Sequence, residues 1–567
     1  MKEPALRTQP AESVAAVDEP AAVAAIQGAN PFVGMTVAQI AAAAARWGLA
    51  FGQHPTVLVS EVLKWSSEEL KVIAGVSATV ADAGDRRFVD AAWQGPVWSR
   101  ILQSYLITRS ALLDSVDNLG LDAKSANRAR FALTQLTEAA APTNSLFGNP
   151  AALKHALRTR GRSLVDGGRH LLYDVRHNGG LPSQVDTRPF RVGESVAATK
   201  GAVVYRTPMF ELIQYTPRTR EVYALPTVVV PPQVNRYYFL DLAPQRSFVE
   251  YAVSRGIQTY LISWRNPGPD ERDWGMDDYA SAAIEAMRVA TRISGADQVN
   301  AAGFCAGGMT LSAVLSHLAA TNDQLINAAT LGVTMLDTDA DSTLNMFVSE
   351  RTVQTAISRS RRKGVLDGKS LARVFAWVRP NDLIWNYWVA NYLLGQNPPA
   401  FDVLAWNKDA TNLPATLHAE FLHMWIDNAL MKPGTAEVLG TKVDLGLVKT
   451  DLYVVGARTD HLVPWQSAYA ATRAFGADVR FVLSNSGHIQ ALINPPGNPK
   501  ASFLTAEQTP ADPDTWFAAA EKSAGSWWVD WADWTIARSG PPRLRPRTVG
   551  DRQHPILEIA PGRYVRE

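Results

Sequence analysis

The sequence predicts an α/β fold, with a mainly parallel sheet and helices between its strands, preceded by a mainly helical N-terminal domain. Three observations lead to this prediction. After about residue 200, short β-branched runs alternate with helical patterns, as in βαβ units. One of these runs passes through a glycine-rich turn directly into a helical pattern. The 567 residues exceed one ordinary domain and provide ample length for a large catalytic core.

The first part of the chain is predicted to hold a tail and a helical domain. Residues 1–30 are rich in Ala, Pro and Glu without stable periodicity, which indicates a mobile tail. Residues 31–190 show a mainly helical pattern, with amphipathic stretches at 37–51 and 97–116. These stretches favour packing against the core over contact with a partner or an apolar particle.

Six short runs after residue 200 are predicted to be the strands of the sheet. They lie at 226–232, 258–264, 299–304, 327–336, 451–458 and 479–486. Between the fourth and fifth runs lies a stretch, about 340–446, that is mostly helical in pattern and rich in Trp and Tyr. It is far longer than an ordinary connection between a helix and a strand. We therefore expect a catalytic domain at 200–567 that carries an inserted helical cap or lid.

Composition excludes several classes of protein. The 55 basic and 54 acidic residues nearly cancel, so no field that would gather nucleic acid is expected. The start has no basic segment followed by an apolar one, and no run of about 18 apolar residues occurs. This pattern predicts a cytoplasmic protein without a membrane span. A single cysteine excludes an internal disulfide and every multi-cysteine metal site, and no metal is predicted.

The most specific motif is the turn GFCAGG at 303–308, which follows a predicted strand and begins a predicted helix. It has the pattern G-x-C-x-G, the nucleophile elbow of an α/β-hydrolase fold with Cys305 in place of serine. A buried lone cysteine is more often inert, but this context favours a nucleophile. The helix start supplies a positive dipole end and free N–H groups, which favour a thiolate and an oxyanion.

Two backbone N–H groups are expected to form the oxyanion hole. The first is that of Ala306, directly after the nucleophile. The second should come from the loop after the first predicted strand, which contains two prolines that have no N–H. Gln233 or Val234 must therefore supply it, and Val234 is our choice.

A nucleophile elbow also predicts a carboxylate and then a histidine, each after a later strand. Asp460 follows the run at 451–458, and His488 follows the run at 479–486. Each alone has a simpler explanation, as a turn aspartate or a structural histidine. Three residues in the right order at strand ends nevertheless favour a catalytic triad. His488 would deprotonate Cys305, and Asp460 would orient and charge-stabilise the imidazole.

At these residues the chain resembles the polyhydroxyalkanoate synthases, from about residue 80 to the C-terminus. Besides the elbow, the motifs that carry the resemblance are PPQVNRYYFLDL (231–242), ISWRNP (262–267), RPNDLIWNYW (379–388), NLPATLH (412–418), DHLVPW (460–465) and SGHIQALINPPGNPK (486–500). The resemblance implies a triad of Cys305, Asp460 and His488 beneath a lid-bearing cap, and a homodimer as the active form.

The resemblance also implies that Asn235, Arg379 and His461 lie close to the coenzyme A or acyl path. From the residues alone, a solvated loop position is an equal alternative for His461. Chain length, the NPPGNPK run and the ending APGRYV are most similar to the single-subunit synthases for medium-chain monomers, the class II group. Phe304, before the cysteine, is more typical of the short-chain class I.

The activity implied is that of an acyltransferase that polymerises (R)-3-hydroxyacyl-CoA into polyester and releases coenzyme A. Exchange of a thiol with a thioester is nearly isoenergetic, so Cys305 could hold the acyl group until the hydroxyl of another unit attacks it. No cofactor is expected, since coenzyme A is the leaving group. The expected partners are the growing polyester, a second copy and granule-associated proteins, at the surface of cytoplasmic granules.

Two other functions remain open. An acyl-CoA thioesterase or esterase of the same fold would need water at the acyl-enzyme, and most such enzymes carry serine in the elbow. A granule-coating or scaffold protein with a decayed site is the non-enzymatic alternative. Retention of the three triad residues and the elbow glycines argues against decay.

Overall fold

The computed structural model describes residues 37–82, 85–340, 349–368, 380–460 and 462–567. These residues form two compact units. The first contains the described residues of 37–186 and 380–399, and the second contains those of 187–368 and 400–567. Among the described residues, no helix is long and apolar enough to cross a membrane.

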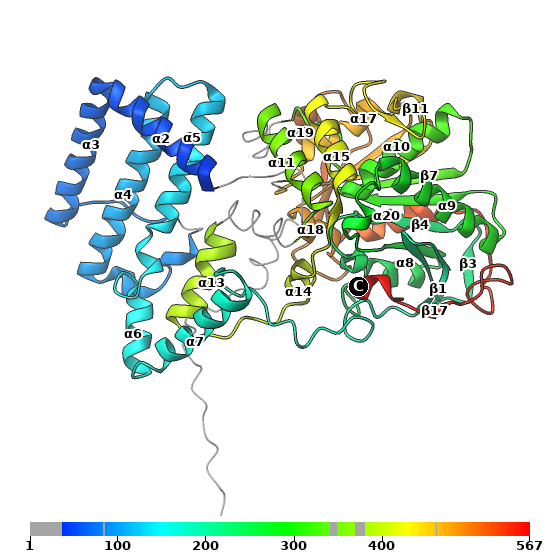
Figure 1. The fold of residues 1–567 in the computed structure, drawn as a ribbon, viewed down its shortest axis with the longest axis horizontal. Helices are drawn as coiled ribbons and strands as arrows, with labels where there is room; N and C mark the ends of the chain where they lie inside the picture. Colours follow the sequence, from blue (N-terminus) through cyan, green and yellow to red (C-terminus); the bar gives the residue numbers. More distant parts are fainter. Residues whose placement is uncertain (1–36, 83–84, 341–348, 369–379, 461) are drawn as a thin grey trace, which may run out of the picture. The chain divides into compact units, whose positions relative to one another are not determined.

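The first unit is built from helices (Figure 1). Helices α3 and α5 both pack on α4, and α2 packs on α5. A small apolar cluster joins α2, α4 and α5, and the indole N–H of Trp47 donates to Ser115 Oγ at 3.0 Å. The helices are α2 (Val37–Gln53), α3 (Pro55–Ala74), α4 (Pro96–Asn118), α5 (Ala123–Ala139), α6 (Pro150–Arg158) and α7 (Arg162–His177).

A segment distant in sequence completes this unit. Residues 380–399 contain α13 (Asn386–Trp388), with π-helical turns at Asn381–Trp385 and Val389–Leu393 on either side. The hydroxyl of Tyr392 donates to the buried carboxylate of Asp174 on α7 at 2.8 Å. A Cβ at Gly167 of α7 would overlap the backbone of Tyr392, so the helix and the segment touch directly. We expected 340–446 to form one cap on the catalytic domain, but this segment packs with the helical unit instead.

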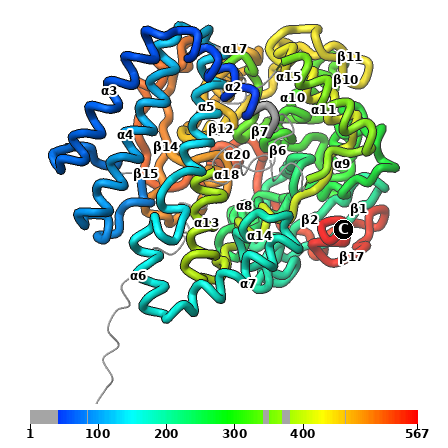
Figure 2. Tube along the Cα trace, turned by 60° about the vertical axis from the view of Figure 1, so that its left-hand side comes forward, coloured from blue at the N-terminus to red at the C-terminus, as the bar shows by residue number. Residues whose placement is uncertain are grey.

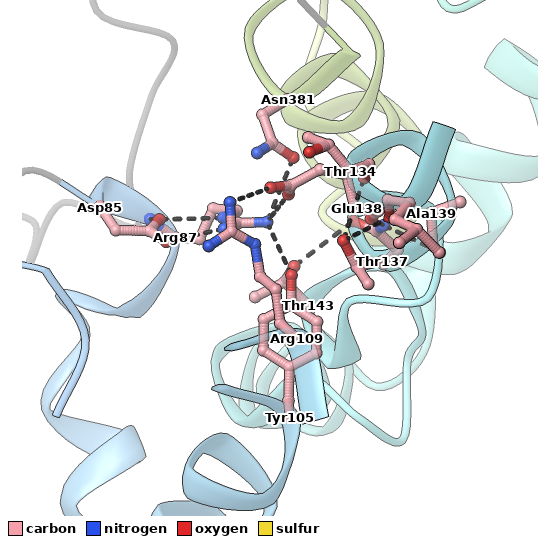
Figure 3. A network of polar contacts seen from close by, with 12 residues as sticks. Asp85, Arg87, Tyr105, Arg109, Thr134, Thr137, Glu138, Ala139, Thr143 and Asn381 are labelled. Atoms are coloured by element: carbon pink, nitrogen blue, oxygen red, sulfur yellow. Dashed lines mark hydrogen bonds and ion pairs between the residues drawn. The ribbon is translucent and has the colours of Figure 1, made fainter. Parts of the chain in front are cut away.

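A group of charged side chains also ties the segment to the helices (Figure 3). Glu138 of α5 is buried and forms ion pairs with Arg87 and Arg109, the latter at 3.3 Å. Arg87 also pairs with Asp85 at 2.7 Å and donates to the side-chain oxygen of Asn381 at 3.2 Å. One carboxylate therefore neutralises two guanidinium groups, one of which also binds the distant segment.

Substitution Glu138→Gln is expected to lower the free energy of unfolding of this unit by about 3 kcal/mol, because two partly buried cations lose their common anion. Urea titration followed by tryptophan fluorescence would measure the change. Glu68→Gln is the matched control, because Glu68 and its partner Lys71 are both largely exposed. The control should shift stability by less than about 1 kcal/mol. Equal midpoints for the two variants would contradict the prediction.

The second unit contains an 11-stranded sheet of the order β15-β14-β13-β12-β7-β6-β4-β5-β2-β1-β17 among the described residues. The strands from β13 to β5 pair in parallel, and the flanking strands pair antiparallel. The parallel strands are β4 (Thr227–Val230), β5 (Thr259–Trp264), β6 (Val299–Phe304), β7 (Ile326–Gly332), β12 (Asp451–Ala457) and β13 (Val479–Ser484). They are the six strands expected from the sequence, and the predicted α/β fold is confirmed.

The flanking strands were not predicted. They are β1 (Gly201–Arg206), β2 (Phe210–Tyr215) and β17 (Glu558–Ile559) at one edge, with β14 (Ser502–Thr505) and β15 (Glu521–Ala524) at the other. Strand β17 brings the C-terminal end of the chain beside β1 (Figure 2). The sheet therefore joins residues near 200 to the last residues of the chain.

Helices pack against this sheet and against one another. Phe248 of α8 lies against Trp531 of α20, with ring centroids 4.4 Å apart. The Trp531 indole N–H donates to Thr330 of β7 at 3.0 Å, which fixes α20 on the sheet. These helices include α8 (Phe248–Ser254), α9 (Met276–Ser294), α10 (Ala306–Ala320), α16 (Trp465–Tyr469), α17 (Ala471–Ala474), α18 (His488–Leu492) and α20 (Trp527–Ile536).

Of the cap expected at 340–446, this unit contains the described residues 340, 349–368 and 400–446. Helices α11 and α15 pack on each other, and His418 Nδ1 lies 2.9 Å from Ser360 Oγ between them. The elements are α11 (Glu350–Lys363), α14 (Asp402–Lys408), α15 (Ala415–Asp427) and the short pairs of β8 (Val365–Leu366) with β9 (Leu413–Pro414) and β10 (Glu437–Val438) with β11 (Thr441–Lys442).

Candidate active site

Cys305 stands on the turn between β6 and α10, as the sequence predicts for a nucleophile elbow. Its φ of +51° and ψ of −123° are uncommon for a residue with a side chain and indicate a strained turn. Its N–H donates to the carbonyl of Gly332 on β7 at 2.8 Å, which holds this conformation. Cys305 is partly exposed and occupies the N-cap position of α10, where its side chain makes no capping hydrogen bond.

The elbow glycines lie where no Cβ would fit. A Cβ at Gly303 would stand 2.8 Å from the Cα of Gly308. A Cβ at Gly307 would overlap the carbonyl oxygens of Val230 and Pro231, and one at Gly308 would overlap the side chain of Thr334. The missing side chains therefore let the start of α10 approach both β6 and the loop after β4.

Substitution Gly308→Ala is expected to destabilise the second unit by about 1–3 kcal/mol, because the added methyl overlaps Thr334 in a packed interior. Thermal unfolding would show the loss, and adding Thr334→Ala should recover part of it by removing two of the overlapping atoms. Gly168→Ala on α7 is the control, since its Cβ meets no atom within 4 Å. The control should be neutral or slightly stabilising. A stable Gly308→Ala variant would contradict this account of the turn.

Asp460 and His488 lie together after the ends of β12 and β13. His488 Nδ1 is 2.6 Å from Asp460 Oδ2, so the ring donates this N–H to the carboxylate. The other oxygen of Asp460 accepts the backbone N–H groups of Leu462 at 2.8 Å and Val463 at 3.0 Å. The side chains of His488 and Asp460 are both almost completely buried. The carboxylate is thus held by its own loop in the orientation that fixes the imidazole.

Cys305 is the second group that acts on His488, as a charge and as a hydrogen-bond partner. Because Nδ1 binds Asp460, the Nε2 atom is the ring nitrogen left for the thiol. Burial alone would lower the pKa of His488, but the charge of Asp460, followed by that of Cys305, outweighs burial and raises this pKa to about 10. The site therefore favours a protonated imidazole beside the Asp460 carboxylate at neutral pH.

Substitution Cys305→Ala is expected to lower the pKa of His488, because it removes both the charge and the hydrogen bond that the thiol contributes. The imidazole signal should titrate at a lower pH in the variant than in the unsubstituted protein. NMR of selectively labelled histidine would follow the titration, with His488→Gln used to assign the signal. An unchanged midpoint would show that Asp460 alone sets the pKa.

The loop after β4 approaches the start of α10. Ala306 is the first residue of that helix, so its backbone N–H has no intrahelical acceptor. Val234 and Asn235 are buried in the loop, and Asn235 has a φ of +68° and a buried Oδ1 with no protein partner among the described residues. The roles of Ala306 and Val234 as oxyanion donors stay predictions. Arg379 and His461 lie outside the described residues.

Sequence reasoning did not identify what holds this loop. The Gln233 side chain donates to Thr310 Oγ1 on α10 at 2.9 Å, and both side chains are buried. The Trp264 indole donates to the carbonyl of Pro231 at 2.9 Å. The strings PPQVNRYYFLDL and ISWRNP contain Gln233 and Trp264, but a motif does not indicate which atoms meet across strands.

Comparisons with known proteins bear on the same regions. A family model described as the N-terminus of poly-beta-hydroxybutyrate polymerase (PhaC) matches residues 84–252, and the model of the alpha/beta hydrolase fold matches residues 232–495. Poly(3-hydroxyalkanoate) polymerase 1 of Ectopseudomonas oleovorans is 44% identical over 95% of this chain and 97% of its own. Poly(3-hydroxyalkanoate) polymerase 2 of the same organism is 45% identical over 90% of this chain and 92% of its own. A poly(3-hydroxyalkanoate) polymerase subunit of Cupriavidus necator is 41% identical over 85% of this chain and 83% of its own.

Proposed function

The chain belongs to the poly(3-hydroxyalkanoate) polymerase family and is an acyltransferase that polymerises 3-hydroxyacyl groups, and from this premise we propose that Cys305 carries each group as a thioester. The observation that supports the proposal is the buried hydrogen bond between His488 and Asp460, with the Cys305 thiol as the other partner of the imidazole. This is the arrangement that an activated thiol nucleophile requires.

In the loading step, the sulfur of Cys305 attacks the thioester carbonyl of 3-hydroxyacyl-CoA. The resulting oxyanion accepts hydrogen bonds from the backbone N–H groups of Ala306 and Val234. The bond between the carbonyl carbon and the coenzyme A sulfur then breaks, and protonated His488 gives its proton to the departing sulfur. The acyl group is left on Cys305, and His488 is left neutral, beside Asp460.

In the elongation step, neutral His488 accepts the proton of a hydroxyl group, and the hydroxyl oxygen attacks the acyl carbonyl on Cys305. The carbon–sulfur bond breaks as an oxoester forms, and the protonated imidazole again faces a sulfur anion. The resting pair is thereby restored without an external proton. The raised pKa of His488 fits a base that must keep this proton between steps.

Further parts of the proposal concern binding and assembly. Asn235, Arg379 and His461 are proposed to contact the coenzyme A or acyl groups. We also propose a homodimer, medium-chain monomers, no cofactor beyond the coenzyme A that leaves, and a place at the surface of cytoplasmic polyester granules with granule-associated proteins. The support for these parts is the resemblance of the motifs, such as NPPGNPK at 494–500, to those of the medium-chain synthases.

The test is to measure coenzyme A release by the purified protein with 3-hydroxybutyryl and 3-hydroxyoctanoyl thioesters, and to analyse the insoluble product for polyester. Release with polyester, lost in the Cys305→Ala variant, is the expected result, with a higher rate for the octanoyl thioester. Acid quenching should trap an acyl group on the one cysteine of the chain. Free hydroxy acids without polyester would identify a thioesterase instead.

A further inference from the structure

The loop of residues 231–236 carries the proposed oxyanion donor Val234, and all its residues are buried. Side chains from other elements hold its backbone at both ends. The Trp264 indole binds the carbonyl of Pro231 at 2.9 Å, and the Trp406 indole of α14 binds the carbonyl of Arg236 at 2.7 Å. The position of Val234 therefore depends on what holds Pro231 and Arg236.

Arg236 is itself a buried cation. It is 6% exposed, and its guanidinium donates to the carbonyl of Tyr564 at 2.8 Å and to Asp409 at 3.4 Å. Tyr238 also donates to Asp409, at 3.0 Å. Burial of a guanidinium is unfavourable unless its N–H groups find acceptors, so these contacts fix the side chain strongly. One of its acceptors, Tyr564, is followed by only three residues of the sequence.

The C-terminal segment, residues 558–567, is held in turn by a buried carboxylate. Glu211 of β2 is fully buried and accepts the backbone N–H groups of Arg563 and Tyr564, each at 3.1 Å. Its own charge is paired with Arg206 of β1. The Tyr564 hydroxyl donates to the carbonyl of Thr207 at 2.6 Å. Figure 2 shows this end of the chain beside β1.

Backbone geometry adds to these contacts. Gly562 has a φ of +78°, and a Cβ there would overlap Glu211 Oε2. Only glycine readily adopts this conformation and leaves that space. The chain therefore turns at Gly562 so that the next two N–H groups face the carboxylate and the carbonyl of Tyr564 faces Arg236.

We propose that Glu211, the C-terminal segment and Arg236 position the oxyanion loop, so that the end of the chain is part of the catalytic apparatus without touching substrate. The contacts run from Glu211 through Tyr564 to Arg236, which follows Val234 and Asn235 directly. This inference rests on the oxyanion role proposed for Val234. Glu211 and Arg236 are thus positioning residues.

The kinetic signature follows from the chemistry of an oxyanion hole. Its donors bind the charged oxygen of the transition state much better than the carbonyl of the bound substrate. Displacing the loop should therefore lower kcat far more than it raises KM, since only the substrate contact proposed for Asn235 in the same loop would act on KM. Loss of one complete oxyanion donor costs about 10²–10³ in kcat, so a displaced donor should cost about 10- to 100-fold.

The test compares the unsubstituted enzyme with four separate variants. Three carry a single substitution, Arg236→Met, Arg236→Lys or Tyr564→Phe, and the fourth is a shortened chain that ends at Gly562. Arg236→Met and the shortened chain should lower kcat for coenzyme A release by about 10- to 100-fold, with KM within about threefold. Arg236→Lys retains a charge and should recover part of the rate. Tyr564→Phe removes one anchoring hydrogen bond and should lower kcat about two- to fivefold. It is the mildest of these changes, so it still tests the proposal if the other variants fail to fold. Arg218→Met, which breaks an exposed ion pair with Glu250, is the matched control and should retain full activity.

A second readout separates loop displacement from damage to the triad. Iodoacetamide alkylates only Cys305, the one cysteine of the chain, and this reaction needs no oxyanion hole. The alkylation rate should therefore stay unchanged in each folded variant. Unchanged kcat in Arg236→Met and Tyr564→Phe, or equal losses in kcat and alkylation rate, would overturn the proposal. Failure of the proposed function would instead appear in the unsubstituted enzyme, as coenzyme A release without polyester.

Discussion

Replacement of His488 by glutamine is expected to lower the rate of coenzyme A release by about 10⁴-fold or more. Glutamine has a similar length and can still hydrogen-bond to Asp460, but it can neither take the proton from a hydroxyl nor give one to coenzyme A. Both the loading and the elongation steps should therefore fail. Single-turnover acylation of Cys305, followed by mass spectrometry of quenched samples, would measure the first step separately.

His317→Gln is a suitable control for this experiment. His317 lies on α10, the helix that begins directly after Cys305, and its Nδ1 is 2.9 Å from Thr441 Oγ1 of β11. It has no part in the proposed chemistry, so the variant should keep its activity. A loss of less than about tenfold in His488→Gln would exclude His488 as the general base.

Asp460→Asn is expected to lower the same rate by about 10³–10⁴-fold. The asparagine oxygen can still accept the N–H groups of Leu462 and Val463, which turns its NH₂ group toward His488 Nδ1. The neutral imidazole that elongation requires then carries its proton on Nε2, where it can no longer accept the proton of the attacking hydroxyl. The variant would thus retain the shape of the site but hold the imidazole in the wrong tautomer.

Two comparisons sharpen this prediction. Asp512→Asn alters an exposed carboxylate that caps α19 (Pro513–Ala519) and should leave the rate unchanged. The double variant Asp460→Asn with His488→Gln should be no slower than His488→Gln alone, because the carboxylate acts through the imidazole. Additive losses would mean that Asp460 contributes independently of His488.

The central sheet and the convergence of Cys305, Asp460 and His488 could be predicted because their signals are local. Each parallel strand is a short β-branched run, buried on both faces, and needs no partner to be recognised. Cys305, Asp460 and His488 each follow such a run, and parallel strands bring their carboxyl ends to one edge of the sheet. Their assembly into one site therefore followed from the order of the strands.

The flanking strands and the division of the cap carry no such signal. Strand β15 is mostly exposed, and its sequence, EKSA, is typical of a loop. Strand β2 buries Glu211 and Gln214, whose side chains accept backbone N–H groups that lie more than 300 positions later, at Arg563 and Tyr564 for Glu211 and at Gly550 for Gln214. The packing of residues 380–399 with helices more than 200 positions earlier depends on contacts that no sequence periodicity records.

Residues 380–399 also impose an order on biosynthesis. The ribosome completes α2 to α7 first, yet Asp174 and Arg87 then lack Tyr392 and Asn381 until about 200 further residues, including β4 to β7, have emerged. The helical unit therefore cannot acquire its final interior while it is the only part synthesised. No single cut in the gene separates the two units, and a fragment that ends at 190 would need this segment grafted to its end or added as a peptide.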